Sequence, residues 1–205
     1  MREQGRICFK QAGLCLALLA FMSAPAVAFD LETPDGRTVT IAIPGNFKHV
    51  FSETDPVEIH EFVPAGETFS DWSEMITVMR MPGTYLDANG ALKDYGSIKL
   101  LGYIQTCSDA LMQPVIEDGS IGGQVSLSTS FACITKEEVR VLPQVDVRPY
   151  EFLSVTYVQA KDHVYEVQRA VHFDTMTEAT LSAALEKNAA NLQYTRDAMA
   201  RCCGG

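Results

Sequence analysis

Four histidines and the acids beside them are the residues of this sequence whose chemistry is easiest to name. The histidines are His49, His60, His163 and His172. Glu58 lies two residues before His60, and Asp174 lies two residues after His172, so in an extended strand each pair shares a face. Imidazole and carboxylate groups bind zinc and copper, and each pair could supply half of a metal site.

A complete metal site needs three or four converging ligands, and a sequence cannot show that convergence. The favoured interpretation is therefore that these histidines and acids are exposed residues on strands and bind no metal. The candidate ligands are His60, His172 and Asp174, and the pair to examine first is His60 with His172. No metal and no cofactor is predicted.

A row of serines could supply a nucleophile. Ser126, Ser128 and Ser130 alternate with apolar residues. No histidine or acid stands at a defined offset to activate one of them, and the sequence contains no G-x-S-x-G, H-E-x-x-H, phosphate-loop or Rossmann glycine pattern. The row is interpreted as the solvated face of an antiparallel strand, and no catalytic residue is predicted.

Two further features have simple structural interpretations. Three methionines between residues 75 and 81 could bind copper, but methionines in an apolar strand more often fill a core. Arg169 could bind an anion, and an ion pair with Glu166 or Glu151 is favoured instead.

The first 28 residues have the features of an export signal. Three basic residues within the first ten positions precede an apolar run over residues 14–22, which is too short to cross a membrane. The small-x-small triplet that ends at Ala28 is a cleavage site. We expect a periplasmic or secreted protein whose mature chain begins at Phe29 and contains no transmembrane segment.

The expected mature chain is strongly acidic. It has 13 basic and 25 acidic residues, which gives a formal charge of −12. Such a charge repels polyanions, so a nucleic-acid partner is not expected. Its length suffices for one well-filled core, and no repeat or linker divides it. Residues 29–205 are therefore predicted to form a single domain.

Four cysteines follow the expected cleavage site: Cys107, Cys133, Cys202 and Cys203. An even number in an exported protein predicts disulfides, and four cysteines allow three connectivities. A bond between Cys107 and Cys133 is favoured, which leaves Cys202 and Cys203 bonded to each other or as free thiols. The alternative joins the C-terminal pair separately to Cys107 and Cys133.

One stretch resembles a known signature. Residues 61–78 read E-F-V-P-A-G-E-T-F-S-D-W-S-E-M-I-T-V and contain the only tryptophan, Trp72. The stretch resembles the P-x-G-E-[ST] and W-[ST]-x-M-[IV]-T signature of uncharacterised bacterial periplasmic proteins. Those proteins are similar to the PsbP-like α/β sandwich, a fold that includes the envelope protein DcrB. The resemblance implies a fold and a compartment, and it transfers no catalytic residue.

The apolar pattern predicts a sheet. Strands are expected over residues 38–43, 57–63, 75–81, 124–134, 139–142, 152–160 and 163–173, and residues 49–56 are expected to form a loop. The run 75–81 is apolar on both faces, which indicates a central strand. Trp72 precedes it and is interpreted as a core anchor rather than a stacking platform, because only Phe69 accompanies it as an aromatic nearby.

The last two strands are expected to form a hairpin. A two-residue turn at Lys161 and Asp162 would pair three sets of residues, namely Val158 with Tyr165, Thr156 with Val167, and Phe152 with Val171. Lys-Asp is not a favoured pair for such a turn, so a longer loop stays open.

Two helices complete the prediction. Residues 91–106 have helical spacing, and Thr175 to Glu178 has the form of a capping box before an apolar stripe that reaches Cys202 and Cys203. The fold class is therefore α+β, an antiparallel β-sheet with two packed helices. This agrees with the PsbP-like resemblance.

The sequence favours a non-enzymatic binding or adaptor domain of the cell envelope, and the partner that this implies is an envelope protein. Such a domain should present a contiguous apolar patch or an open sheet edge. The alternative is a small periplasmic metalloprotein or hydrolase whose site assembles from distant residues. It predicts that His60, His172 or Asp174 converge in a pocket.

Overall fold

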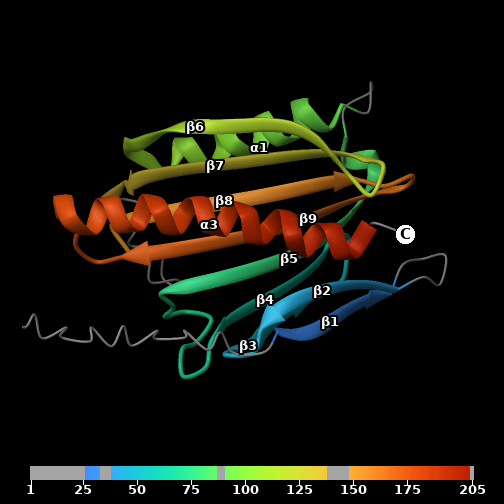
Figure 1. The fold of residues 1–205 in the computed structure, drawn as a ribbon, viewed down its shortest axis with the longest axis horizontal. Coiled ribbons are helices and arrows are strands. Elements are labelled where there is room, and N and C mark those ends of the chain that lie inside the picture. Colours follow the sequence, from blue (N-terminus) through green and yellow to red (C-terminus); the bar gives the residue numbers. More distant parts are fainter. Residues whose placement is uncertain (1–25, 33–37, 87–90, 138–147, 204–205) are drawn as a thin grey trace, which may run out of the picture.

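A seven-stranded antiparallel sheet forms the centre of the molecule (Figure 1). The computed structural model describes residues 26–32, 38–86, 91–137 and 148–203, and side chains as far as residue 200. The strand order is β3-β4-β5-β9-β8-β7-β6. The strands are β3 (Phe47–Glu53), β4 (Glu58–Pro64), β5 (Glu74–Pro82), β6 (Cys107–Ile121), β7 (Gln124–Thr135), β8 (Tyr150–Gln159) and β9 (His163–Phe173).

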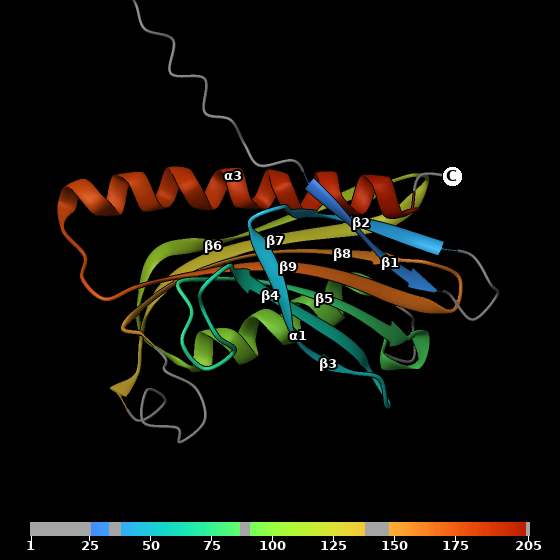
Figure 2. The same ribbon diagram turned by 90° about the horizontal axis from the view of Figure 1, so that it is seen from below.

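Different elements cover the two faces of this sheet (Figure 2). One face is covered by the long helix α3 (Glu178–Cys203) and by a separate two-stranded ribbon of β1 (Ala26–Glu32) and β2 (Thr38–Pro44). The other face carries α1 (Leu92–Gln105), which follows a short 3-10 turn, η1 (Gly83–Tyr85). The predicted α+β architecture with two packed helices is therefore confirmed. No helix within the described ranges is long and apolar enough to span a membrane.

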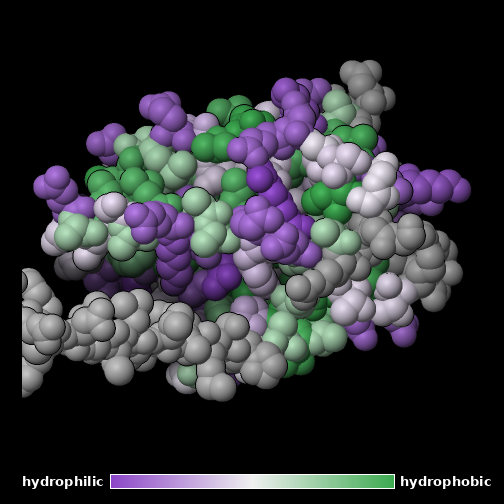
Figure 3. All heavy atoms as spheres, viewed as in Figure 1, coloured by the Kyte–Doolittle hydropathy of each residue, from purple (hydrophilic) through white to green (hydrophobic). Residues whose placement is uncertain are grey.

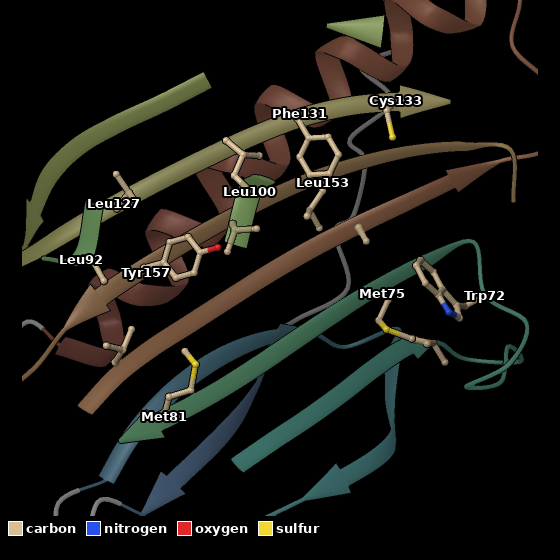
Figure 4. Close-up of a cluster of buried hydrophobic side chains, with 14 residues drawn as sticks. Trp72, Met75, Met81, Leu92, Leu100, Leu127, Phe131, Cys133, Leu153 and Tyr157 are labelled. Atoms are coloured by element: carbon tan, nitrogen blue, oxygen red, sulfur yellow. The ribbon is translucent and has the colours of Figure 1, made fainter. Parts of the chain in front are cut away.

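The α1 side is built around an apolar cluster that Figure 4 shows in close-up. Gly96 lets the helix approach the sheet closely, because a Cβ at this position would lie 2.1 Å from the Leu127 side chain. The helix packs on β6, β7 and β8. The half of the sheet formed by β4 and β5 lies beyond it.

The serine row of β7 lies under α3 and not in solvent, so the predicted solvated face is wrong. Ser126, Ser128 and Ser130 are all buried. The Asn188 side chain accepts a hydrogen bond from Ser154 at 2.8 Å and donates one to Ser130 at 2.8 Å. The apolar side chains of β7 therefore pack in the core on the α1 side, and the alternating serines pack on the other side against polar side chains of α3.

Seen from the α3 side, the surface mixes hydrophilic and hydrophobic side chains (Figure 3). The most hydrophilic spheres gather over the helix, and hydrophobic ones lie between and around them. Ser130, Ser154 and Asn188, whose hydrogen bonds lie below the helix, are buried.

Several predicted elements are confirmed. β5 is central, flanked by β4 and β9. The β8–β9 hairpin has the predicted register, with Val158 opposite Tyr165 and Phe152 opposite Val171. The Ala160 N–H donates to the His163 carbonyl at 2.9 Å, which closes the two-residue turn. Residues 139–142, a further predicted strand, lie outside the described residues.

Three predictions need correction. Residues 49–56 were expected to form a loop, but residues 47–53 form the edge strand β3; a bulge between His49 and Phe51 breaks its alternation. β6 was not predicted, since its pairing with β7 shifts register three times and it contains Pro114. The cap of α3 is Thr177 and not Thr175: the Thr180 N–H donates to the Thr177 hydroxyl at 3.2 Å.

A disulfide joins Cys107 to Cys133, with their Cα atoms 5.7 Å apart. This is the pairing that the sequence favoured. Cys107 begins β6 directly after α1 ends, so the bond fixes the C-terminal end of that helix to β7. Cys202 and Cys203 end α3, and their side chains are outside the described part of the structure.

The hydrogen bonds of Asn188 make a first prediction. Asn188→Ala should lower the free energy of unfolding by about 1 to 2 kcal/mol, because it removes the amide group that pairs with the buried Ser130 hydroxyl. Ser154 loses the same amide group but keeps its hydrogen bond to the Asn188 carbonyl at 3.0 Å. Gln193→Ala, on the exposed side of the same helix, is the control and should change stability by less than about 0.5 kcal/mol. Urea denaturation measures both, and equal losses would contradict a polar network under α3.

Candidate functional site

An open groove of about 300 Å³ lies on the α1 side of the sheet, beyond the helix. Alternation along each strand points one set of side chains into it. The floor is apolar where β5 and β8 supply Met75, Met79 and Leu153, and Trp72 closes one end. Figure 4 shows Trp72 beside Met75 at the start of β5.

A polar row crosses this floor. Glu61 on β4 is the cross-strand partner of Thr77 on β5, and Thr77 is the partner of Gln168 on β9. Tyr103 reaches down from α1, and its hydroxyl donates to Gln168 Oε1 at 3.0 Å. Gln168 Nε2 in turn donates to Glu166 Oε1. Three strands and one helix therefore place donors and acceptors across an otherwise apolar groove.

Carboxyl groups on this face have raised pKa values. Burial raises the pKa of Glu166 to about 7, although the Lys99 ammonium and the Gln168 hydrogen bond act in the opposite direction. Burial also raises the pKa of Glu151 to about 7, and it raises that of Glu61 against a hydrogen bond from Thr77. Carboxyls with perturbed pKa values in a cleft are typical of functional sites.

Trp72 stacks on His172 with ring centroids 3.8 Å apart. Both rings are buried, and Trp72 belongs to the apolar cluster, as the core-anchor interpretation expects. Burial, together with the nearby Arg148 guanidinium, lowers the pKa of His172 to about 4, so this imidazole is neutral at physiological pH. The stack gives the end of the groove a rigid aromatic wall.

Several buried polar atoms on this face lack a hydrogen-bond partner. Among them are Glu61 Oε2, Trp72 Nε1, Glu166 Oε2 and His172 Nδ1. Buried polar groups in proteins are nearly always paired, and an unpaired one costs about 1 to 3 kcal/mol. Two of these side chains, Glu61 and Trp72, line the groove itself. A molecule that enters the groove would therefore lie beside one donor and one acceptor whose hydrogen bonds are not made within the protein.

The structure does not bring the sequence-based metal candidates together. His60 is opposite Val78, which is opposite Val167, and His172 lies five residues further along β9. Five residues of a strand span roughly 16 Å, so the two histidines are separated by about this distance along the strands. Because five is an odd number and successive side chains alternate, the two histidines lie on opposite faces of the sheet. The third candidate, Asp174, is exposed and pairs with Arg148 at 3.3 Å. Among the described residues, no group of three or more His, Cys, Asp or Glu side chains could hold a metal ion.

His60 instead contacts His49, a residue that sequence reasoning had placed in a loop. His60 Nδ1 is 3.3 Å from His49 Nε2, and His60 Nε2 is 3.0 Å from Glu58 Oε1. The pairing of β3 with β4 creates this contact, so only recognition of β3 as a strand could have revealed it.

Arg169 forms an ion pair, as expected, but its partner is Glu74 and neither of the two predicted acids. Its guanidinium contacts Glu74, which also binds Lys187 at 3.1 Å, and lies 4.7 Å from the Tyr194 ring centre. Neither Glu151 nor Glu166 is its partner, because they lie on the α1 face and Arg169 points to α3. Met75, Met79 and Met81 are buried in the core, as expected.

Two other hollows are less suited to specific binding. A cavity of about 420 Å³ beside the disulfide is lined mainly by apolar groups from the end of α1, β6 and β7, among them Ile104, Met112 and Phe131. A smaller one of about 250 Å³ lies where Arg196 approaches Glu117 and Asp118. Neither is lined by a buried polar atom that lacks a partner, among the described residues.

No protein-family model and no curated protein matches the chain. Similar solved structures include a variant of the protein Mog1 and the Ran-binding protein Mog1p of Saccharomyces cerevisiae. Each is 14% identical, with TM-scores of 0.49 and 0.48, and each comparison covers 86% of this chain and 93% of the other. PsbP (CyanoP) of Synechocystis sp. PCC 6803 is 15% identical with a TM-score of 0.45, over 88% of this chain and 96% of that one. These likenesses are too remote to transfer a site residue.

Glu166 makes a prediction on pH dependence. Its pKa of about 7 in the folded chain exceeds the ordinary value of 4.5, so the folded state keeps a proton that the unfolded state loses. The carboxyl therefore lowers stability as pH rises from 4.5 to 7. Glu166→Gln removes this titration. The free energy of unfolding of the variant minus that of the parent should therefore increase between pH 4.5 and pH 7 by up to about 3 kcal/mol.

Urea denaturation at a series of pH values measures this difference. His172→Phe is the control of opposite sign: the His172 pKa is depressed from 6.5 to about 4, so its contribution is complete above 6.5 and is lost as pH falls toward 4. A difference between Glu166→Gln and the parent that does not change with pH would show that Glu166 titrates normally.

Proposed function

We propose that this chain is an exported, non-enzymatic binding protein that takes a small organic molecule into the groove on the α1 side of the sheet. The observation that carries the proposal is the pair of unpartnered polar atoms, Trp72 Nε1 and Glu61 Oε2, on side chains that line an open groove with a mixed apolar and polar lining. The N-terminal features of residues 1–28 support export to the periplasm or beyond.

The groove defines the chemistry of its ligand. The Trp72 N–H requires an acceptor, and the Glu61 carboxyl oxygen requires a donor. Met75 and Met79 supply adaptable apolar surface on the floor of the groove. A volume of about 300 Å³ is at the lower end for small-molecule sites. The ligand is therefore a compact amphipathic molecule that carries both a hydrogen-bond acceptor and a hydrogen-bond donor.

The competing metalloprotein or hydrolase hypothesis loses its distinguishing feature. It required His60, His172 or Asp174 to converge, and these residues lie on two faces and at an exposed strand end. An adaptor that pairs through a sheet edge is also less favoured. The edge strands β3 and β6 both contain register shifts, and β6 contains Pro114, features that discourage strand addition.

Fluorescence tests the groove directly, because Trp72 is the only tryptophan and therefore the only source of indole emission. Titration of the purified protein with a panel of small periplasmic metabolites should identify a ligand that shifts this emission. Glu61→Met should weaken its binding at least tenfold without loss of stability, since it replaces a buried carboxyl by an apolar side chain of similar length.

The matched control is Met112→Ala, which alters the cavity beside the disulfide and should leave the affinity unchanged. A ligand that binds Glu61→Met and the parent equally, but loses affinity in Met112→Ala, would move the site to that cavity and contradict the proposal. A ligand whose affinity neither substitution changes would contradict it as well.

A further inference from the structure

The contact between His49 and His60 lies on the face of the sheet opposite the groove, where β3 pairs with β4. His49 is exposed and His60 is mostly buried. Their facing nitrogens, His49 Nε2 and His60 Nδ1, are 3.3 Å apart, and the ring centres are 5.3 Å apart. The cluster shares no residue with the lining of the proposed groove, although Ile59 and Glu61 of that lining are neighbours of His60 along β4.

A carboxylate fixes the orientation and the tautomer of His60. Glu58 Oε1 is 3.0 Å from His60 Nε2, and an ionised carboxylate only accepts hydrogen bonds, so Nε2 carries the proton. In the neutral ring this leaves the lone pair on Nδ1, the atom that faces His49. Glu58 is itself held by Arg80 at 2.7 Å. The chain from Arg80 through Glu58 to His60 is the arrangement that orients histidine ligands in metal proteins.

The second ring is held as well. His49 makes a hydrogen bond with the backbone of Phe51, and its ring centre is 5.0 Å from that of Phe62. Phe29 from β1 packs edge-on against His60, with ring centres 4.7 Å apart. Aromatic contacts on both rings therefore limit their rotation and keep the two nitrogens facing each other.

The nitrogen spacing suits a metal ion. Two imidazole nitrogens that bind one tetrahedral ion, each at about 2.0 to 2.1 Å, lie about 3.3 to 3.4 Å apart. The observed 3.3 Å meets this value for a tetrahedral ion such as Zn²⁺. Adjacent nitrogens around a square-planar Cu²⁺ ion lie about 2.8 to 2.9 Å apart, so binding of Cu²⁺ requires the two rings to approach by about 0.5 Å. In the absence of a metal, a single proton on His49 Nε2 can bridge the same two nitrogens, and a metal ion would replace that proton.

We propose that His49 and His60 bind one late transition-metal ion, Cu²⁺ more tightly than Zn²⁺, with Glu58 as the positioning carboxylate. Two histidines supply two ligands, and water completes the coordination on the exposed His49 side. Imidazole nitrogen selects copper and zinc over the oxygen-preferring Mg²⁺ and Ca²⁺, and copper precedes zinc in the general order of stability.

Metal titration of the purified protein tests the site, with free thiols alkylated so that cysteines outside the disulfide cannot bind the metal. Competition with a chromophoric chelator should give a 1:1 complex with Cu²⁺ and a weaker one with Zn²⁺. His49→Ala should lower the Cu²⁺ affinity at least tenfold and should fold normally because His49 is exposed. Glu58→Gln should lower it less, since the amide still contacts His60 but no longer requires the same tautomer.

His163→Ala is the matched control, because this histidine lies on β9 away from the cluster. The electron paramagnetic resonance spectrum of the Cu²⁺ complex provides a second readout. It should show coupling to two imidazole nitrogens in the parent and in His163→Ala, and to one in His49→Ala. Unchanged affinity in His49→Ala, an equal loss in His163→Ala, or no Cu²⁺ binding by the parent would each overturn the proposal.

Discussion

The pairing of β5 with β9 is the contact on which the rest of the structure depends. It joins the strands β3, β4 and β5 to the later strands β8, β7 and β6, which are distant in sequence. Both strands are almost entirely buried, so the register between them is fixed by packing on two faces. That register places Thr77 opposite Gln168 and so creates the polar row of the groove. A slip of one residue would reverse every side chain of one half of the sheet.

Polar side chains in the middle of the sheet give its two faces different properties. On the α3 side most of them are paired: Arg169 pairs with Glu74, and Asn188 joins Ser130 to Ser154, while the buried Asn191 Nδ2 of the helix has no hydrogen-bond partner among the described residues. On the α1 side the helix covers only part of the sheet, and several buried polar atoms, among them those of Glu61 and Trp72, have no partner. The contrast within one molecule is the physical reason to assign binding to the α1 side and stability to the α3 side.

Local sequence signals predicted those parts of the fold that depend on local physics. The β8–β9 register followed from alternation and a short turn, and the central position of β5 followed from its apolar character on both faces. β3 and β6 escaped prediction because bulges interrupt their alternation. The serines of β7 were misplaced because polarity alone does not distinguish solvent from a helix that carries Asn188 and Arg196.

The candidate sites were less predictable than the fold. Trp72 and Glu61 stood in the stretch that drew attention in the sequence, yet the groove also needs Gln168 and Tyr103, which only the β5–β9 pairing and the placement of α1 bring near. The sequence singled out His60 as a candidate ligand together with His172, but the neighbour of His60 is His49. Both cases show that a site built across strands is determined by register, which single residues do not reveal.

Native mass spectrometry of the protein, purified from its own cells without denaturation, tests the central claim most directly. The account predicts the mass of a disulfide-containing chain together with a non-covalent adduct of one small organic molecule, and loss of that adduct from the Glu61→Met variant. An adduct retained in full by Glu61→Met, or a chain that carries no organic adduct under conditions that preserve weak complexes, would contradict a ligand site in the groove.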